Sequence, residues 1–78
     1  MALKGKDWQG LAKGLLKAEL KRRNLSCGDL AEKLRAIGIE DNERNIANKI
    51  ARGSFTAVLF IQCMEAIGVK ILRLEEDL

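Results

Sequence analysis

Apolar residues recur at every third or fourth position in separate stretches of this chain, and this spacing constrains the fold more than any other feature. In residues 7–23 the repeating positions are Trp8, Leu11, Ala12, Leu15, Leu16 and Leu20. Such a stripe is the buried face of an amphipathic helix. Proline is absent and Val and Thr are few, so little in the chain favours a sheet with tight turns. The pattern predicts an all-α fold.

Polar caps and left-handed closing residues mark where the predicted helices begin and end. The predicted N-caps are Asp7, Ser26, Asp41 or Asn42, and Thr56. The predicted closing residues are Asn24, Gly38, Gly53 and Gly68. The clearest signal is a capping box between Ser26 and Asp29, which starts the second helix. These signals predict helices over residues 7–23, from 26 to about 37, over 43–52, and from 56 to 67.

With 78 residues the chain has room for one domain. We expect a flexible basic N-terminus at 1–6, a helical domain at 7–74 and an acidic tail at 75–78. The segment 69–74 fits a short strand or a further helical turn equally well. The predicted architecture is therefore a small bundle of four to five helices. Trp8 is expected to anchor the first helix on the core or on a partner subunit.

The residue types argue against an enzyme and against a cofactor. Histidine is absent, and Cys27 and Cys63 do not form a C-x-x-C pair, so a metal site is not expected. Cys27 at a helix start lacks a neighbouring base, and we interpret it as a small buried thiol rather than a nucleophile. The longest apolar run, residues 57–61, is too short to cross a membrane. We expect a cytoplasmic protein with reduced cysteines and no membrane partner.

The charge is unevenly distributed. Without the three acids of the tail, fourteen Lys and Arg residues oppose eight acids. On the third predicted helix, residues Arg44, Asn45, Asn48, Lys49 and Arg52 lie on the arc opposite the apolar side. Asn side chains pair with adenine and Arg or Lys with guanine in the major groove, which admits one helix. An ordinary solvated helix face is the alternative interpretation.

Three motifs together resemble the lambda repressor/Cro-like helix-turn-helix superfamily. Residues 25–34 read L-S-C-G-D-L-A-E-K-L, similar to the family's second helix. Residues 49–53 (K-I-A-R-G) resemble the end of its third helix, and residues 66–69 (A-I-G-V) the close of its fourth. The segment 35–42 is longer than the family's usual turn between helices two and three. The resemblance thus implies a divergent helix-turn-helix domain of bacterial or phage-like type.

The resemblance implies a set of residues that bind double-stranded DNA. Groove contacts fall on Asn42, Arg44, Asn45 and Asn48, and phosphate contacts on Lys49 and Arg52. Ser26 and Cys27 are placed at a helix start beside the DNA backbone. Lys17, Lys21, Arg22 and Arg23 are either further phosphate contacts or cations that complement the helix C-terminus.

The function expected from these residues is sequence-specific binding of double-stranded DNA by a transcriptional regulator. Because one short helix reads few base pairs, we expect a homodimer through the fourth helix and the 69–74 segment. The alternative is a small helical protein–protein interaction module, an adaptor or antitoxin-like protein, that does not bind DNA.

Overall fold

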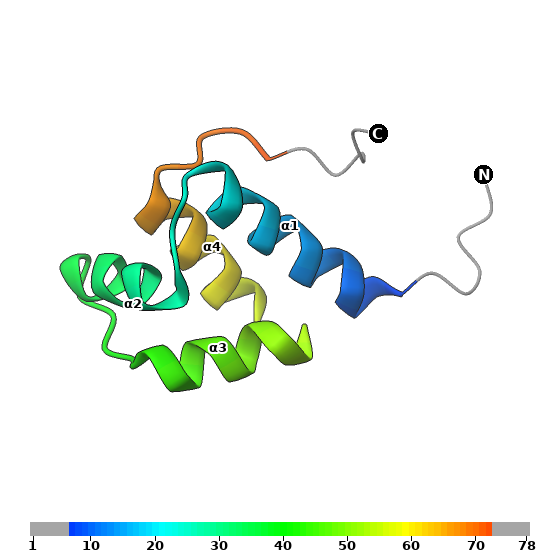
Figure 1. Ribbon diagram of the computed structural model, residues 1–78, viewed down its shortest axis with the longest axis horizontal. Helices are drawn as coiled ribbons and strands as arrows, with labels where there is room; N and C mark the ends of the chain where they lie inside the picture. Colours follow the sequence, from blue (N-terminus) through cyan, green and yellow to red (C-terminus); the bar gives the residue numbers. More distant parts are fainter. Residues whose placement is uncertain (1–6, 73–78) are drawn as a thin grey trace.

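The computed structural model describes residues 7–72, and in this range the chain forms four helices and no strand. They are α1 (Trp8–Arg22), α2 (Cys27–Ala36), α3 (Glu43–Arg52) and α4 (Ala57–Ile67). Helices α3 and α4 each pack against both α1 and α2, and α3 forms one edge of the molecule (Figure 1). The prediction of a small all-α bundle is confirmed.

The core forms where the inner stripes of the helices meet. Its buried apolar residues are Leu16, Leu20, Leu30, Ala31, Leu34, Ile46, Ile50, Cys63, Met64 and Ile67. Every helix contributes to this set, so each is held mainly by tertiary packing rather than by its own propensity.

The predicted caps are confirmed at the start of every helix. Asp7, Ser26, Asn42 and Thr56 each accept a hydrogen bond from a backbone N–H in the first turn. At the second start the capping box is complete, because the Asp29 carboxylate also accepts from the Ser26 N–H at 2.9 Å. Phe55 and Phe60 stack across the start of α4, with ring centroids 5.9 Å apart.

The helix ends also follow the prediction. Asn24 and Gly38 adopt positive φ after α1 and α2, as do Gly53 and Gly68 after α3 and α4. At Gly53 the requirement is twofold, since φ is +70° and a Cβ would lie 2.5 Å from the carbonyl oxygen of Gln9. The end of α3 is therefore pressed against the start of α1, where only glycine fits.

The segment between α2 and α3 comprises residues 37–42, which we call the connector. It exceeds the three to four residues that commonly join the two helices of a helix-turn-helix. The extra residues do not lengthen α2, because Gly38 ends that helix with φ +88° and the Ile39 N–H donates to the Leu34 carbonyl.

Two expectations about the ends of the domain need correction. Trp8 is 57% exposed and does not anchor α1 on the core of this chain. It is the first residue of α1, eight positions before Leu16, which is the first buried residue of that helix. The other expected role, an anchor on a partner subunit, stays a prediction. Residues 69–72 form neither strand nor helix, because Gly68 ends α4 and the Val69 N–H caps it by donating to the Met64 carbonyl. The predicted arm at 1–6 and tail at 75–78 lie outside the described residues.

Candidate nucleic-acid interface

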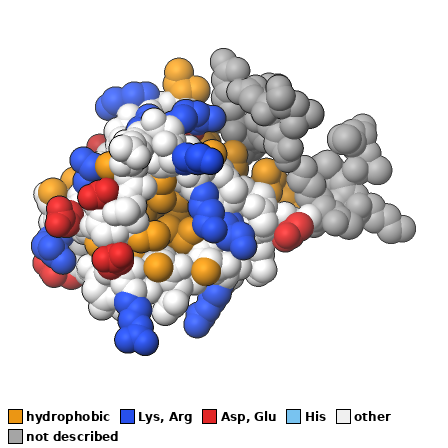
Figure 2. Space-filling model, in the orientation of Figure 1, with side chains coloured by type: hydrophobic (Ala, Val, Ile, Leu, Met, Phe, Trp, Pro, Cys, Tyr) orange, Lys and Arg blue, Asp and Glu red, His pale blue; other side chains and the backbone are white. Residues whose placement is uncertain are grey.

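The outer face of α3 carries most of the predicted groove-reading residues. Ile46 and Ile50 are buried and hold the helix on the core. Arg44, Asn48 and Arg52 are exposed, with Asn48 opposite the two isoleucines. Figure 2 shows cationic side chains that project beyond the α3 edge of the molecule. The described structure thus presents amide and guanidinium groups on a surface that the bundle does not cover.

Asn42 and Asn45 differ in what they offer to a ligand. The Asn42 side chain is the N-cap of α3, and its Oδ1 accepts from the Asn45 N–H at 2.8 Å. Its oxygen is therefore committed to holding the helix. The side chain of Asn45 is exposed beside that of Asn48. The Asn45 side chain also contributes a hydrogen bond that lowers the pKa of Asp41, but it does not cap the helix.

Lys49 lies on the flank of α3 rather than on its outer face. Its Nζ donates to Asp41 Oδ2 in the connector at 2.8 Å. The hydrogen bond from Lys49 is the largest of the causes that hold the pKa of Asp41 below its usual range. Lys49 was predicted as a phosphate contact, but the structure gives it an internal partner.

A lysine that sequence reasoning missed supports α3 from the neighbouring helix. Lys13 Nζ donates to the Ala51 carbonyl at 3.2 Å, at the C-terminal end of α3. A cation is favourable there, because the last carbonyls of a helix are partly negative. Lys13, Lys17 and Lys21 are spaced four residues apart on α1 and so share one face of it. The four-residue spacing was the sequence signal that could have identified this face. The hydrogen bond between Lys13 and Ala51, which are 38 residues apart, has no such signal.

Arg22 and Arg23 bind an acid of their own helix. Arg22 lies 2.6 Å from one oxygen of the buried Glu19, and Arg23 binds the other oxygen and donates to the Ile67 carbonyl. Burial alone would raise the pKa of Glu19, but the hydrogen bonds and charges of the two arginines outweigh it and lower that pKa. Arg22 and Arg23 were predicted either as DNA contacts or as cations that complement the helix end. The structure pairs both with Glu19, and Arg23 alone also ties the end of α1 to the end of α4.

The start of α2 is crowded with carboxylates. Ser26 Oγ accepts from the Asp29 N–H at 3.1 Å and donates to Asp29 Oδ2 at 3.0 Å. A Cβ at Gly28 would lie 3.0 Å from the carboxylate of Glu43, so this acid also sits beside the helix start. Cys27 is half-buried and packs against the core. These carboxylates occupy the positive helix end where a DNA phosphate was expected beside Ser26 and Cys27.

Hydrogen bonds from Ser26, first from its backbone N–H and then from its hydroxyl, hold the pKa of Asp29 low. Its carboxylate therefore keeps its charge at the start of α2.

The described residues contain no group of three His, Cys, Asp or Glu side chains arranged to hold a metal ion. Burial raises the pKa of the Cys63 thiol to about 11, which keeps it protonated. In the part of the chain that the structure describes, no helix is long and apolar enough to span a bilayer.

Comparison with curated proteins finds no match, and comparison with solved structures finds none. Residues 8–72 match the family described as "Domain of unknown function (DUF6471)". The matched range contains all four helices of the described structure. Because the match covers more than half of the chain, this protein belongs to the DUF6471 family.

Proposed function

We propose that this chain binds double-stranded DNA sequence-specifically through α3, as a divergent helix-turn-helix protein of the lambda repressor/Cro-like type. The observation that carries the proposal is the exposed face of Arg44, Asn45, Asn48 and Arg52 on a helix fixed at both ends. A short rigid helix with such a face suits the major groove, which is about 12 Å wide. The protein would act as a transcriptional regulator by occupying an operator, without chemistry of its own.

The positions of the residues predict which of them contact bases and which contact phosphates. Asn48 lies at the centre of the outer face and reads a base edge, whereas Arg52 near the helix end contacts a phosphate. Lys17 and Lys21, which are exposed on the same face of α1 as Lys13, supply further phosphate contacts. Both cysteines are free thiols, which fits a reducing compartment such as the cytoplasm.

A salt titration with duplexes selected from a random pool tests the proposal. Affinity should fall with salt concentration, with a slope of about 0.9 per phosphate contacted. Asn48→Ala should relax the base preference by about 1–3 kcal/mol at one position and leave the salt slope unchanged. Arg52→Ala should weaken binding to all sequences and lower the slope by about 1.

Arg35→Ala is the matched control for Arg52→Ala, because Arg35 is also exposed near a helix end and carries the same charge. An equal loss of affinity in both variants would mean that net charge, and not α3, governs binding.

We further propose that two copies associate through α4. Val58 and Ile61 on this helix are 64% and 65% exposed, although they are large and apolar. Ile61→Lys should convert a dimer to a monomer in sedimentation, whereas Ile37→Lys, at an exposed isoleucine after α2, should not. A native protein that sediments as an 8.7 kDa species at high concentration would contradict the dimer.

The same exposed residues of α4 favour the second candidate function, an adaptor or antitoxin-like module that binds another protein. Under that alternative the outer face of α3 is only solvated. Absence of duplex binding even at low salt would favour the adaptor over the DNA-binding protein.

A further inference from the structure

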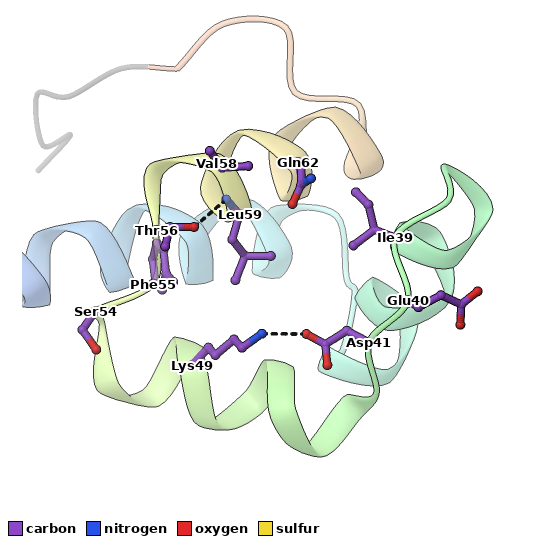
Figure 3. A pocket seen from close by; sticks show the side chains of 10 residues that line it. All are labelled: Ile39, Glu40, Asp41, Lys49, Ser54, Phe55, Thr56, Val58, Leu59 and Gln62. Atoms are coloured by element: carbon purple, nitrogen blue, oxygen red, sulfur yellow. Dashed lines mark hydrogen bonds and ion pairs between the residues drawn. The ribbon is translucent and has the colours of Figure 1, made fainter.

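A groove of about 400 Å³ lies between α3 and α4 and is bordered by the connector. Figure 3 shows the side chains that line it, with Lys49 below, Leu59 and Gln62 above, and Ile39 and Asp41 from the connector at one side. The volume falls within the range of small-molecule sites. The connector, which is longer than a usual helix-turn-helix turn, thus contributes Ile39, Glu40 and Asp41 to the lining of this groove.

One side of the groove is apolar. Ile39, Phe55 and Leu59 line it and are partly buried against the core. Phe55 is fixed by stacking on Phe60. These three side chains offer a surface for the apolar body of a ligand, and the surface exists before any ligand binds.

The lining of the groove contains two acids, Glu40 and Asp41, and one cation, Lys49. The side chain of Lys49 is 46% exposed, whereas that of its partner Asp41 is 11% exposed. Both oxygens of Asp41 already accept hydrogen bonds, one from Lys49 and one from the Asn42 N–H at 2.9 Å. Lys49 has three donors and one partner among the described residues, so donors remain for an acceptor in the groove.

The remaining polar side chains of the lining are those of Glu40, Ser54, Thr56 and Gln62. The Gln62 side chain extends from α4 toward the groove, and its amide can donate (Figure 3). The Glu40 carboxylate points away from the groove in the same view. The groove therefore combines an apolar wall with donors from α3 and α4.

We propose that this groove binds a small organic carboxylate with an apolar body. The carboxylate accepts hydrogen bonds from Lys49 and Gln62, and the apolar body lies on Ile39, Phe55 and Leu59. Such a ligand would contact α3 on the flank away from its outer face. The proposal goes beyond DNA binding and does not depend on it.

The test is a titration of the ¹⁵N-labelled full chain followed by amide chemical shifts, with three probes that share a phenyl group. Phenylacetate carries a negative charge, 2-phenylethanol none and 2-phenylethylamine a positive one. Phenylacetate should give saturable shifts at Lys49, Phe55, Leu59 and Gln62, with a Kd of about 1 mM for so small a ligand. The alcohol and the amine should bind about fivefold more weakly or worse.

Two substitutions should change the phenylacetate affinity in opposite directions. Lys49→Met removes the ammonium and should weaken binding by about fivefold. Asp41→Asn removes the competing charge and should strengthen binding by about threefold. Arg52→Met is the control, because it removes the same charge from the exposed face of the same helix and should leave the affinity unchanged.

The amide spectrum of each variant also reports whether it is folded. Absence of saturable shifts with phenylacetate, equal binding of the amine, or an equal loss in Arg52→Met would overturn the proposal. Because no DNA is present in the titration, failure of the proposed DNA binding would leave its result unaffected.

Discussion

Helices α3 and α4 are built alike toward the core and differently toward the outside. Each begins at a polar N-cap, Asn42 or Thr56, and ends at a glycine with positive φ. Each buries an apolar stripe in the same core. On the outside, α3 exposes amides and guanidinium groups, whereas α4 exposes Val58 and Ile61.

The difference teaches that folding of this bundle depends on the inner stripes and caps and leaves the outer faces open to other uses. Substitution of an exposed polar residue on a helix has little effect on the free energy of unfolding. Exposed apolar residues are not removed from water by folding, so they add no hydrophobic stabilisation. The proposed partners are accordingly assigned to the outer faces, a polyanion to α3 and an apolar surface to α4. Substitutions on each face test whether both inner faces are needed for folding and whether both outer faces can be changed without loss of stability.

The largest effect is expected from the inner faces. Ile46→Ala in α3 and Ile67→Ala in α4 should each lower the free energy of unfolding by about 2–5 kcal/mol, because each removes buried methyl groups and leaves a cavity. Urea denaturation measures both. A cost below about 1 kcal/mol for either residue would show that its helix is not part of the cooperative core.

A smaller effect is expected at Gly53, which follows α3 and precedes α4. Gly53→Ala should cost about 2–3 kcal/mol, because positive φ is strained for alanine and the new methyl group meets the Gln9 carbonyl. Gly38→Ala is the matched control, since its φ is also positive but its Cβ would point into open space. It should cost about 1 kcal/mol in the same denaturation experiment. Equal costs would mean that the contact between α3 and α1 is not tight.

The next effect concerns two cations that bind carbonyl groups at helix C-termini. Lys13 of α1 donates to the Ala51 carbonyl of α3, and Arg23, which follows α1, donates to the Ile67 carbonyl of α4. Only Arg23 is held by a buried acid, so Glu19→Gln should lower stability by about 1–2 kcal/mol at pH 7. The pKa of Glu19 is lower in the folded chain than its unfolded value of about 4.3. Its stabilising effect is therefore complete above about pH 4.3 and disappears as the pH falls through the folded pKa.

Thermal unfolding followed from pH 7 to pH 3 checks this sign. The melting temperature of Glu19→Gln should fall less steeply with acid than that of the native chain. Part of the slope should remain, because the pKa values of Asp29 and Asp41 are also lowered. Glu32→Gln, at an exposed position on α2, should retain the native acid dependence. A parallel acid dependence of Glu19→Gln and the native chain would contradict the ion pairs of Glu19 with Arg22 and Arg23.

The smallest effects are expected from the outer faces. Asn48→Ala in α3 and Ile61→Ser in α4 should each change the free energy of unfolding by less than about 0.5 kcal/mol at protein concentrations that favour the monomer. Calorimetry at two concentrations separates folding from association. A loss above about 1 kcal/mol from Asn48→Ala under these conditions would mean that the outer face of α3 supports the fold.

The helices and their ends were predictable from the sequence because the signals are local. The capping box of Ser26 and Asp29 and the left-handed residues Asn24 and Gly53 act within a few positions of where they stand. Contacts between distant positions were not predictable. Nothing in the sequence pairs Lys13 with Ala51, and the groove exists only because the connector folds beside α3 and α4.

The candidate site was predicted in part for the same reason. Helical spacing places Arg44, Asn48 and Arg52 on one face, and these residues are exposed as expected. The partners of Lys49, Arg22 and Arg23 depend on which acids lie near them in the fold, and here the prediction from the resemblance placed cations on DNA that the structure pairs internally.

Helix α3 is attached to the rest of the bundle at its two ends and on its inner side. The Asn42 cap holds one end, Gly53 wedged against Gln9 holds the other, and Ile46 and Ile50 fasten the underside. None of these attachments involves the side chains of Arg44, Asn45 or Asn48 that face solvent. Under the proposed DNA binding, substitutions at those three positions would change the recognised operator with almost no loss in the free energy of unfolding.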